Sequence, residues 1–325
     1  MRTAGKQSEL IILRTISVIN EKSVNFMDLY TEIKGNFILP NAYEDWKEYR
    51  NTLTQYLIQE TNQLSLPLSF HANMTEESLL PSLAIIGAGA CNDLDISQLI
   101  EHFSEITLLD YNEDAMRSAI DTYHLDGCPY IDCQAISLNG IKDVHYDDFC
   151  NRLQTYLCHN IDQLSPYDFE DYAISLLNNL LKQMENYTIP LPAKTYDYVC
   201  CFGVHSQLQA MFSYIYRAFE MNLKEMNFFD ASAHNQRFTK RLQEENERFI
   251  PLFHDALLNC AKQGIFLGLE EKRTNTDGAI EGAYQGIQDI KKRDLTTKQT
   301  SLVWPFLPSE DIYYEMTLLK ISLNQ

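Results

Sequence analysis

The stretch Ser82-Leu83-Ala84-Ile85-Ile86-Gly87-Ala88-Gly89 decides the fold class, because a short apolar run here ends in a glycine-rich turn. Apolar runs of this length, bounded by turn residues, suit strands that are buried on both faces of a parallel sheet. The glycines allow a tight turn and a close approach of the backbone to a ligand. The stretch therefore predicts a buried strand that ends where α/β sheets bind their ligands.

Helix and strand patterns alternate downstream of this turn. The expected strands are Ile106–Asp110, Tyr130–Ile136, Tyr196–Phe202 and Ile265–Leu269, and the expected helices cover 93–103, 112–123, 207–222 and 234–262. Strands that alternate with helices form a mainly parallel sheet with helices on both faces. The sequence therefore predicts an α/β fold.

The C-terminal part departs from this alternation. Ser301–Trp304 and Tyr314–Leu323 have strand patterns and are separated by turn residues, with no helix between them. We expect these two strands to form an antiparallel hairpin at one edge of the sheet. The polar stretch 272–300 contains Gly278, Gly282 and Gly286, and its composition favours a loop.

Two further segments are expected to be helical. Residues 1–78 are interpreted as an N-terminal helical element, with helices around Leu10–Ile19 and from Glu44 to Gln59, and residues 79–325 as the main domain. An acidic, tyrosine-rich stretch at about 145–190 is too long for an ordinary connection between strand units. We expect it to be a helical insertion in the main domain.

Composition excludes several classes of protein. The net charge of −19 disfavours nucleic acid as a partner, since phosphate backbones are bound by lysine and arginine. No apolar stretch reaches the length of a membrane span, and no signal peptide is evident, so we expect a cytoplasmic protein without a membrane partner. The 8 cysteines form no C-x-x-C pair, and no spaced cluster of ligands predicts a metal site.

The acid at the end of the second predicted strand points to a nucleoside ligand. Asp110 lies 23 positions after Gly87, which is the spacing at which a carboxylate accepts hydrogen bonds from a ribose diol. Nicotinamide cofactors use the same pair of features but favour a third glycine under their pyrophosphate. Asn92 occupies that position here. S-adenosylmethionine (SAM) has no pyrophosphate and does not need this glycine.

Four segments resemble the class I, Rossmann-like SAM-dependent methyltransferases. Leu83–Gly89 resembles their motif I, Ile106–Asp110 their second strand, Tyr196–His205 their fourth strand, and Tyr313–Leu323 the antiparallel seventh strand that distinguishes them from dehydrogenases. The resemblance implies a Rossmann-like, mainly parallel seven-stranded sheet and SAM as the cofactor. The residues that it implies in cofactor binding are Gly87, Ala88, Gly89, Asp110, Tyr111, Asp132, Phe202 and Gly203.

The sequence also departs from that family. Its members often have an acidic residue just before the first glycine, where this chain has Ile85-Ile86. Asp93 or Asp95, after the glycines, is a candidate to replace that contact. The departure keeps open a non-catalytic, methyltransferase-like binding subunit as an alternative, beside an NAD-dependent oxidoreductase.

The resemblance implies transfer of a methyl group to an acceptor, which we expect to be a small molecule or a peptide. His205, just past the fourth strand, is the candidate catalytic residue, because an imidazole can accept a proton near neutral pH. An equally open interpretation is that His205 supports the helix that follows it.

Overall fold

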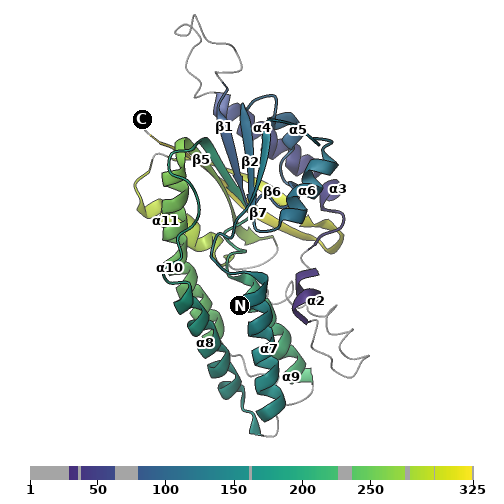
Figure 1. The fold of residues 1–325 in the computed structure, drawn as a ribbon, viewed down its shortest axis with the longest axis vertical. Coiled ribbons are helices and arrows are strands. Elements are labelled where there is room, and N and C mark those ends of the chain that lie inside the picture. The colour runs from purple at the N-terminus through teal and green to yellow at the C-terminus, as the bar shows by residue number, and fades with distance from the viewer. Residues whose placement is uncertain are drawn as a thin grey trace, which may run out of the picture.

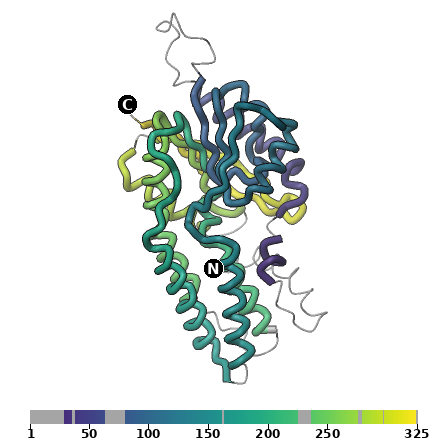
Figure 2. The backbone as a smooth tube through the Cα atoms, in the orientation of Figure 1, coloured from purple at the N-terminus to yellow at the C-terminus, as the bar shows by residue number. Residues whose placement is uncertain are grey.

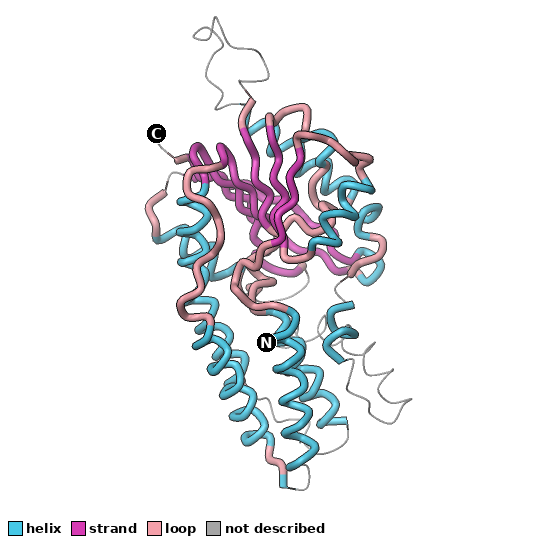
Figure 3. Tube along the Cα trace, viewed as in Figure 1, coloured by secondary structure: helices cyan, strands magenta, loops and turns pink. Residues whose placement is uncertain are grey.

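The computed structural model describes residues 29–35, 38–62, 80–160, 163–225, 236–274, 279–295 and 297–323. In this part of the chain, seven strands form one sheet in the order β3-β2-β1-β4-β5-β7-β6. The strands are β1 (Ser82–Ile86), β2 (Glu105–Asp110), β3 (Ile131–Ala135), β4 (Tyr196–Phe202), β5 (Ala261–Arg273), β6 (Thr297–Leu307) and β7 (Ile312–Ser322). Figure 3 shows them gathered in one half of the molecule, with helices alone in the other half.

The sheet is parallel except at one edge. Strands β1 to β5 pair in parallel, whereas β7 pairs antiparallel with both β5 and β6. A short 3-10 turn, η5 (Pro308–Glu310), joins β6 to β7. This confirms the predicted fold class: a mainly parallel, Rossmann-like sheet with a C-terminal antiparallel hairpin, as the resemblance to class I methyltransferases implied.

Helices cover both faces of the sheet, because successive strand residues point to opposite sides. Ile85, Tyr198 and Phe266 pack against α3 (Ala42–Asp45), α4 (Lys47–Asn62), α5 (Ile96–Leu99) and α6 (Glu113–Thr122). Their chain neighbours, such as Val199 and Leu267, pack instead against the second half of α10 (Arg237–Cys260) and against α11 (Ala283–Lys292). We call these sides the α4 face and the α10 face.

A second core lies in a bundle that extends from the sheet, which we call the helical arm (Figure 1; Figure 2 shows the chain path). It consists of α2 (Leu29–Gly35), α7 (Asp143–Asn160), α8 (Pro166–Gln183), α9 (Ala210–Glu225) and the first half of α10, packed around phenylalanines such as Phe169, Phe212 and Phe238. The stretch expected as an insertion supplies α7 and α8. None of the helices in the described ranges is long and apolar enough to cross a bilayer.

One expected loop is a helix. Residues 283–292 form α11, which buries Ala283, Ile287 and Ile290 on one side, so the expectation of a loop over 272–300 is wrong there. Gly286 misled the prediction: it lies inside the helix because a Cβ at this position would stand 2.5 Å from Leu269 Cδ2. The expected helix around Leu10–Ile19 lies outside the described residues.

Candidate functional site

The glycine-rich turn links two neighbouring strands at the carboxyl edge of the sheet. Gly87 has φ of +72°, and a Cβ there would stand 2.2 Å from Val204 Cγ2, so only glycine fits. The amides of Gly87 and Ala88 donate to the carbonyl oxygen of Leu109, at 2.7 and 3.2 Å. These amides therefore fasten the turn to β2, and the turn's contribution to a ligand is the close approach of a backbone without bulky side chains.

Asp110 lies against this turn. Its Oδ2 accepts a hydrogen bond from the Gly89 amide at 2.9 Å, and its Oδ1 accepts one from the Asn112 amide at 2.7 Å. Burial raises the pKa of the Asp110 carboxyl, although the backbone donors of Asn112 and Gly89 oppose that shift. The two features that predicted a nucleoside ligand, the glycines and the acid, thus meet at one place.

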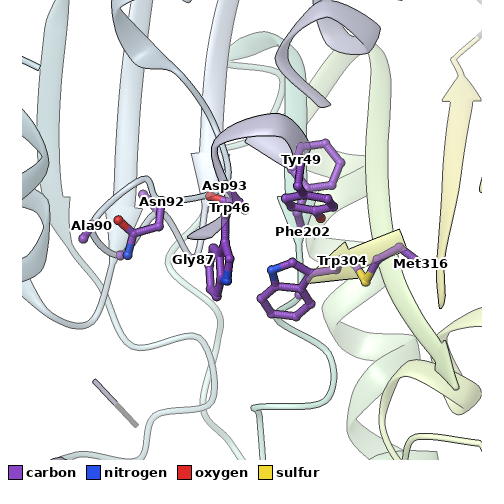
Figure 4. Close-up of a pocket in the computed structure, with 12 residues that line it drawn as sticks. Trp46, Tyr49, Gly87, Ala90, Asn92, Asp93, Phe202, Trp304 and Met316 are labelled. Atoms are coloured by element: carbon purple, nitrogen blue, oxygen red, sulfur yellow. The ribbon is translucent and has the colours of Figure 1, made fainter. Parts of the chain in front are cut away.

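A pocket of about 180 Å³ opens beside Gly89 (Figure 4). It is lined by Trp46, Tyr49, Gly87, Ala88, Gly89, Ala90, Asn92, Asp93, Phe202, Gly203, Trp304 and Met316. These residues come from α3–α4, from the turns after β1 and β4, and from the β6–β7 hairpin. We call this space the aromatic pocket, because four of its side chains carry aromatic rings.

The rings of the aromatic pocket support one another across segments far apart in sequence. Trp46 meets the edge of Trp304 with ring centroids 4.9 Å apart, and Tyr49 stacks on Trp304 at 6.0 Å. Trp46 Nε1 donates to the carbonyl oxygen of Phe306 at 3.2 Å. The Nε1 of Trp304 is buried and has no hydrogen-bond partner among the described residues. The pocket thus has a rigid apolar wall with one polar group left over.

The acid of the aromatic pocket is Asp93, one of the two candidates from the sequence. Burial raises the pKa of its carboxyl to about 6, with Arg50 and two backbone amides acting in the opposite direction. Asp95 instead caps α5, accepting hydrogen bonds from the amides of Ser97 and Gln98. The side chains that line the pocket in the described residues include no lysine, arginine or histidine.

Arg50 supports the loop that carries Asp93. Its Nη1 donates to the carbonyl oxygens of Asn92, at 3.0 Å, and of Tyr43, at 2.8 Å. Its guanidinium lies 4.1 Å from the centre of the Tyr43 ring. The buried cation thus joins α4 to the turn after β1 and leaves the Asp93 carboxylate to the pocket.

Not all of the predicted cofactor-binding residues gather here. Gly87, Ala88, Gly89, Phe202 and Gly203 line the aromatic pocket, and Asp110 borders it through Gly89. Asp132 pairs with Thr107 near the start of β3, whereas Ala135 pairs with Asp110, so Asp132 lies toward the opposite edge of the sheet. The ring of Tyr111 is exposed, and its hydroxyl accepts from the Asp143 amide at 2.8 Å.

His205 lies on the α10 face, away from the aromatic pocket. It is fully buried, and its Nε2 is 2.9 Å from the Nε2 of His254, whose Nδ1 is 2.7 Å from Asp289 Oδ2. Burial and the neighbouring His254 hold the pKa of His205 well below its usual value. Its position matches the interpretation that it supports the neighbouring helices.

Sequence reasoning missed most of the aromatic wall. Trp46 and Tyr49 lie three positions apart in the predicted N-terminal helical element, so a shared apolar face was visible. Its location over the turn after β1 was not visible, because it depends on packing between segments more than 30 residues apart. Trp304 and Met316 lie on the predicted hairpin, which did not indicate the side they face.

No family model matches this sequence, and no curated protein sequence matches it. Among solved structures, the chain is similar to magnesium protoporphyrin IX methyltransferase from Synechocystis PCC 6803 with bound SAM, at 9% identity and a TM-score of 0.39, covering 92% of this chain and 85% of that one. It is also similar to the N-methyltransferase NodS from Bradyrhizobium japonicum WM9, at 11% identity and a TM-score of 0.38, covering 85% and 98%. At such values we infer nothing about this chain from the activities of those proteins.

Proposed function

We propose that this chain binds SAM at the aromatic pocket and transfers its methyl group to a small molecule or a peptide. One observation carries the proposal. Asp110, a ribose-binding acid by position, is hydrogen-bonded to Gly89, which also lines a pocket with aromatic walls and a carboxylate. A nucleoside ligand with a cationic end matches both halves of this arrangement.

The charge of the aromatic pocket suits that cationic end. SAM carries a sulfonium and an ammonium group against one carboxylate, so its net charge is positive, and aromatic faces attract cations through their quadrupole. Asp93 supplies a carboxylate, and no basic side chain among the described lining residues competes for it. Asp93 takes the place of the acid that the family carries before the first glycine.

A dinucleotide fits the same residues less well. A pyrophosphate is bound by free backbone amides and a helix N-terminus. Here the amides of Gly87, Ala88 and Gly89 are engaged by β2 residues, and the first amides of α5 are capped by Asp95. The geometry therefore favours SAM over NAD as the ligand.

The size of the aromatic pocket limits which part of SAM it can enclose. At about 180 Å³ it is smaller than the range of roughly 300–1,000 Å³ that is usual for sites of whole small ligands. The enclosed space therefore suits the amino-acid end, while the half-buried Asp110 is available to the sugar. Bound SAM supplies a methyl group that is already activated, and the residues of this chain bind it, orient it and exclude water.

Isothermal titration tests the proposal. We expect SAM and its demethylated product S-adenosylhomocysteine (SAH) to bind and NAD to give no heat. Asp110→Asn is expected to weaken SAH binding by about tenfold or more, because a charge-assisted contact to the ribose is lost. Asp132→Asn is the matched control: it changes an exposed acid of the adjacent strand and should leave affinity unchanged. Binding of NAD without SAH would contradict the proposal.

A further inference from the structure

A second buried acid, Glu270, points toward the aromatic pocket from β5. It pairs across the sheet with Met316, which lines the pocket, and directly paired residues of antiparallel strands project to the same face. Phe266, two alternations earlier on β5, also packs on the α4 face. Glu270 therefore lies on the pocket side of the sheet, near the ends of the parallel strands.

Gly203 leaves the space between Glu270 and the pocket free of a side chain. Gly203 has φ of +65° and lines the aromatic pocket, and a Cβ at this position would stand 3.5 Å from Glu270 Oε1 and 3.6 Å from the Trp304 ring. The acid thus lies directly behind a lining residue that has no side chain, next to the Trp304 indole.

Among the described residues, one oxygen of Glu270 has a hydrogen-bond partner and the other has none. Oε1 accepts a hydrogen bond from Ser206 Oγ at 2.8 Å, whereas Oε2 is buried with no partner among the described residues. The side chain is only 2% exposed. A buried carboxylate oxygen without a partner costs free energy, and its position behind Gly203 allows a ligand in the aromatic pocket to supply the missing donor.

Several weak acids among the described residues lie within reach of the Glu270 charge, and Arg217 on α9 acts in the opposite direction on one of them, Tyr214. Tyr49 on α4, Tyr214 on α9 and Cys201 on β4 all have raised pKa values to which the Glu270 charge contributes, although burial is the main cause for each. Burial also raises the pKa of Glu270 itself to about 7, with the Ser206 hydrogen bond opposing the shift. A carboxyl group with a pKa near neutrality suits proton transfer at physiological pH.

We propose that Glu270 Oε2 binds the nitrogen of an amine acceptor and takes up its proton, so that this chain is an N-methyltransferase. The inference rests on the proposed function and names its class of acceptor. A protonated amine gives one proton to the carboxylate, which becomes a carboxylic acid. The freed lone pair forms the N–CH₃ bond as the S–CH₃ bond breaks, and that electron pair returns to sulfur. The product leaves as an N-methylammonium, and Glu270 returns its proton to solvent.

The chemistry of the site selects an amine over other acceptors. A carboxylate partner favours a cationic donor, and the aromatic walls favour a cation as well.

The test needs no acceptor. Sinefungin is the analogue of SAM in which a carbon bearing an ammonium group replaces the sulfonium and its methyl. SAH has an uncharged thioether at this position. If Glu270 faces that position, the wild-type protein should bind sinefungin about tenfold or more tighter than SAH at pH 8, because a charge-assisted hydrogen bond is gained. The preference should shrink as pH falls below about 7, where Glu270 becomes protonated.

Glu270→Gln should bring the ratio of the two dissociation constants close to one at both pH values. Glu271→Gln is the matched control, because Glu271 is exposed on the same strand, accepts from Thr317 Oγ1 and should leave the ratio unchanged. Protonation of Asp93 affects both ligands alike, since both carry the same amino-acid end, and so cancels in the ratio.

The outcomes separate the two proposals. Failure of wild-type protein to bind SAM or SAH overturns the proposed function. Binding of SAH with no pH-dependent preference for sinefungin, or with a preference that Glu270→Gln retains, overturns this inference alone. If Glu270→Gln does not fold, the pH dependence of the wild-type ratio decides the matter by itself.

Discussion

Glu270 and His205 are both buried titratable groups near the carboxyl ends of β4 and β5, yet they lie on opposite faces of the sheet. Glu270 projects to the α4 face, beside the aromatic pocket; its Oε2 and the Nδ1 of His205 are both buried without a hydrogen-bond partner among the described residues. His205 projects to the α10 face, where its ring packs on Phe253 and contacts His254. The side of the sheet that each residue faces therefore decides whether it lies beside the aromatic pocket or in the core under α10 and α11.

His205 and His254 belong to a hydrogen-bonded network on the α10 face of the sheet. Asp289 accepts a hydrogen bond from His254 Nδ1, so the Nε2 of a neutral His254 accepts one from His205. Arg293 completes the network by pairing with both Asp289 and Asp255. Burial keeps the pKa values of both histidines below the usual value, so the network is built from uncharged rings.

The largest effect expected from this comparison is on stability. His205→Ala should lower the free energy of unfolding by about 4 kcal/mol, because it leaves a cavity and an unpaired His254 nitrogen. Urea denaturation measures the loss, and titration of the folded variant with SAH should give wild-type affinity. A variant that kept its stability but lost affinity would move His205 back into the functional site.

Glu270→Gln should raise the free energy of unfolding, whereas His205→Ala should lower it. The pKa of Glu270 is raised from 4.5 to about 7 in the folded protein, so the folded state binds more protons than the unfolded chain between these values. Stability is therefore lost as pH rises through this window. At about 1.4 kcal/mol per pKa unit, the variant should gain up to about 3 kcal/mol at pH 8 and little at pH 4.5. Urea denaturation at both pH values measures this, and equal effects at the two would show that Glu270 is not a strained acid.

The smallest expected effect concerns the acid of the aromatic pocket. Asp93→Asn should weaken SAM binding by about tenfold, about 1.4 kcal/mol, through loss of a carboxylate partner for the ammonium group. Wild-type affinity should fall as pH drops below about 6, where Asp93 becomes protonated. Asp95→Asn serves as control, because it alters the cap of α5 and lies outside the pocket lining. Equal losses in both variants, measured by titration, would place the effect in the loop rather than in the charge.

Local sequence patterns predicted the parts of the site that depend on strand ends. Asp110 was found because it terminates a short apolar strand, and Glu270 carries the same signal directly after Leu269. Glu270 was not among the predicted site residues, and the predicted strand ended at Leu269, whereas β5 continues to Arg273. The side of the sheet to which His205 projects could not be predicted, since the positive φ of Gly203 redirects the chain after β4.

The residues that form the walls of the aromatic pocket could not be predicted from local sequence patterns. Trp46 and Trp304 are 258 positions apart in sequence, and their contact depends on how α4 and the hairpin pack over the sheet. The choice between Asp93 and Asp95 likewise depended on where α5 begins, since a helix that starts at Ile96 makes Asp95 its N-cap. Fold class followed from alternation alone, whereas the pocket required tertiary packing.

Helix α10 belongs to two cores at once, with Phe238 and Leu242 in the helical arm and Phe253 and Leu257 against the sheet. A single continuous helix therefore packs in both the helical arm and the core beside the sheet. Deleting the arm would remove the apolar cover from the first half of α10, whose second half packs on the sheet. The helical arm is thus packed as part of the same folded unit as the sheet, through α10.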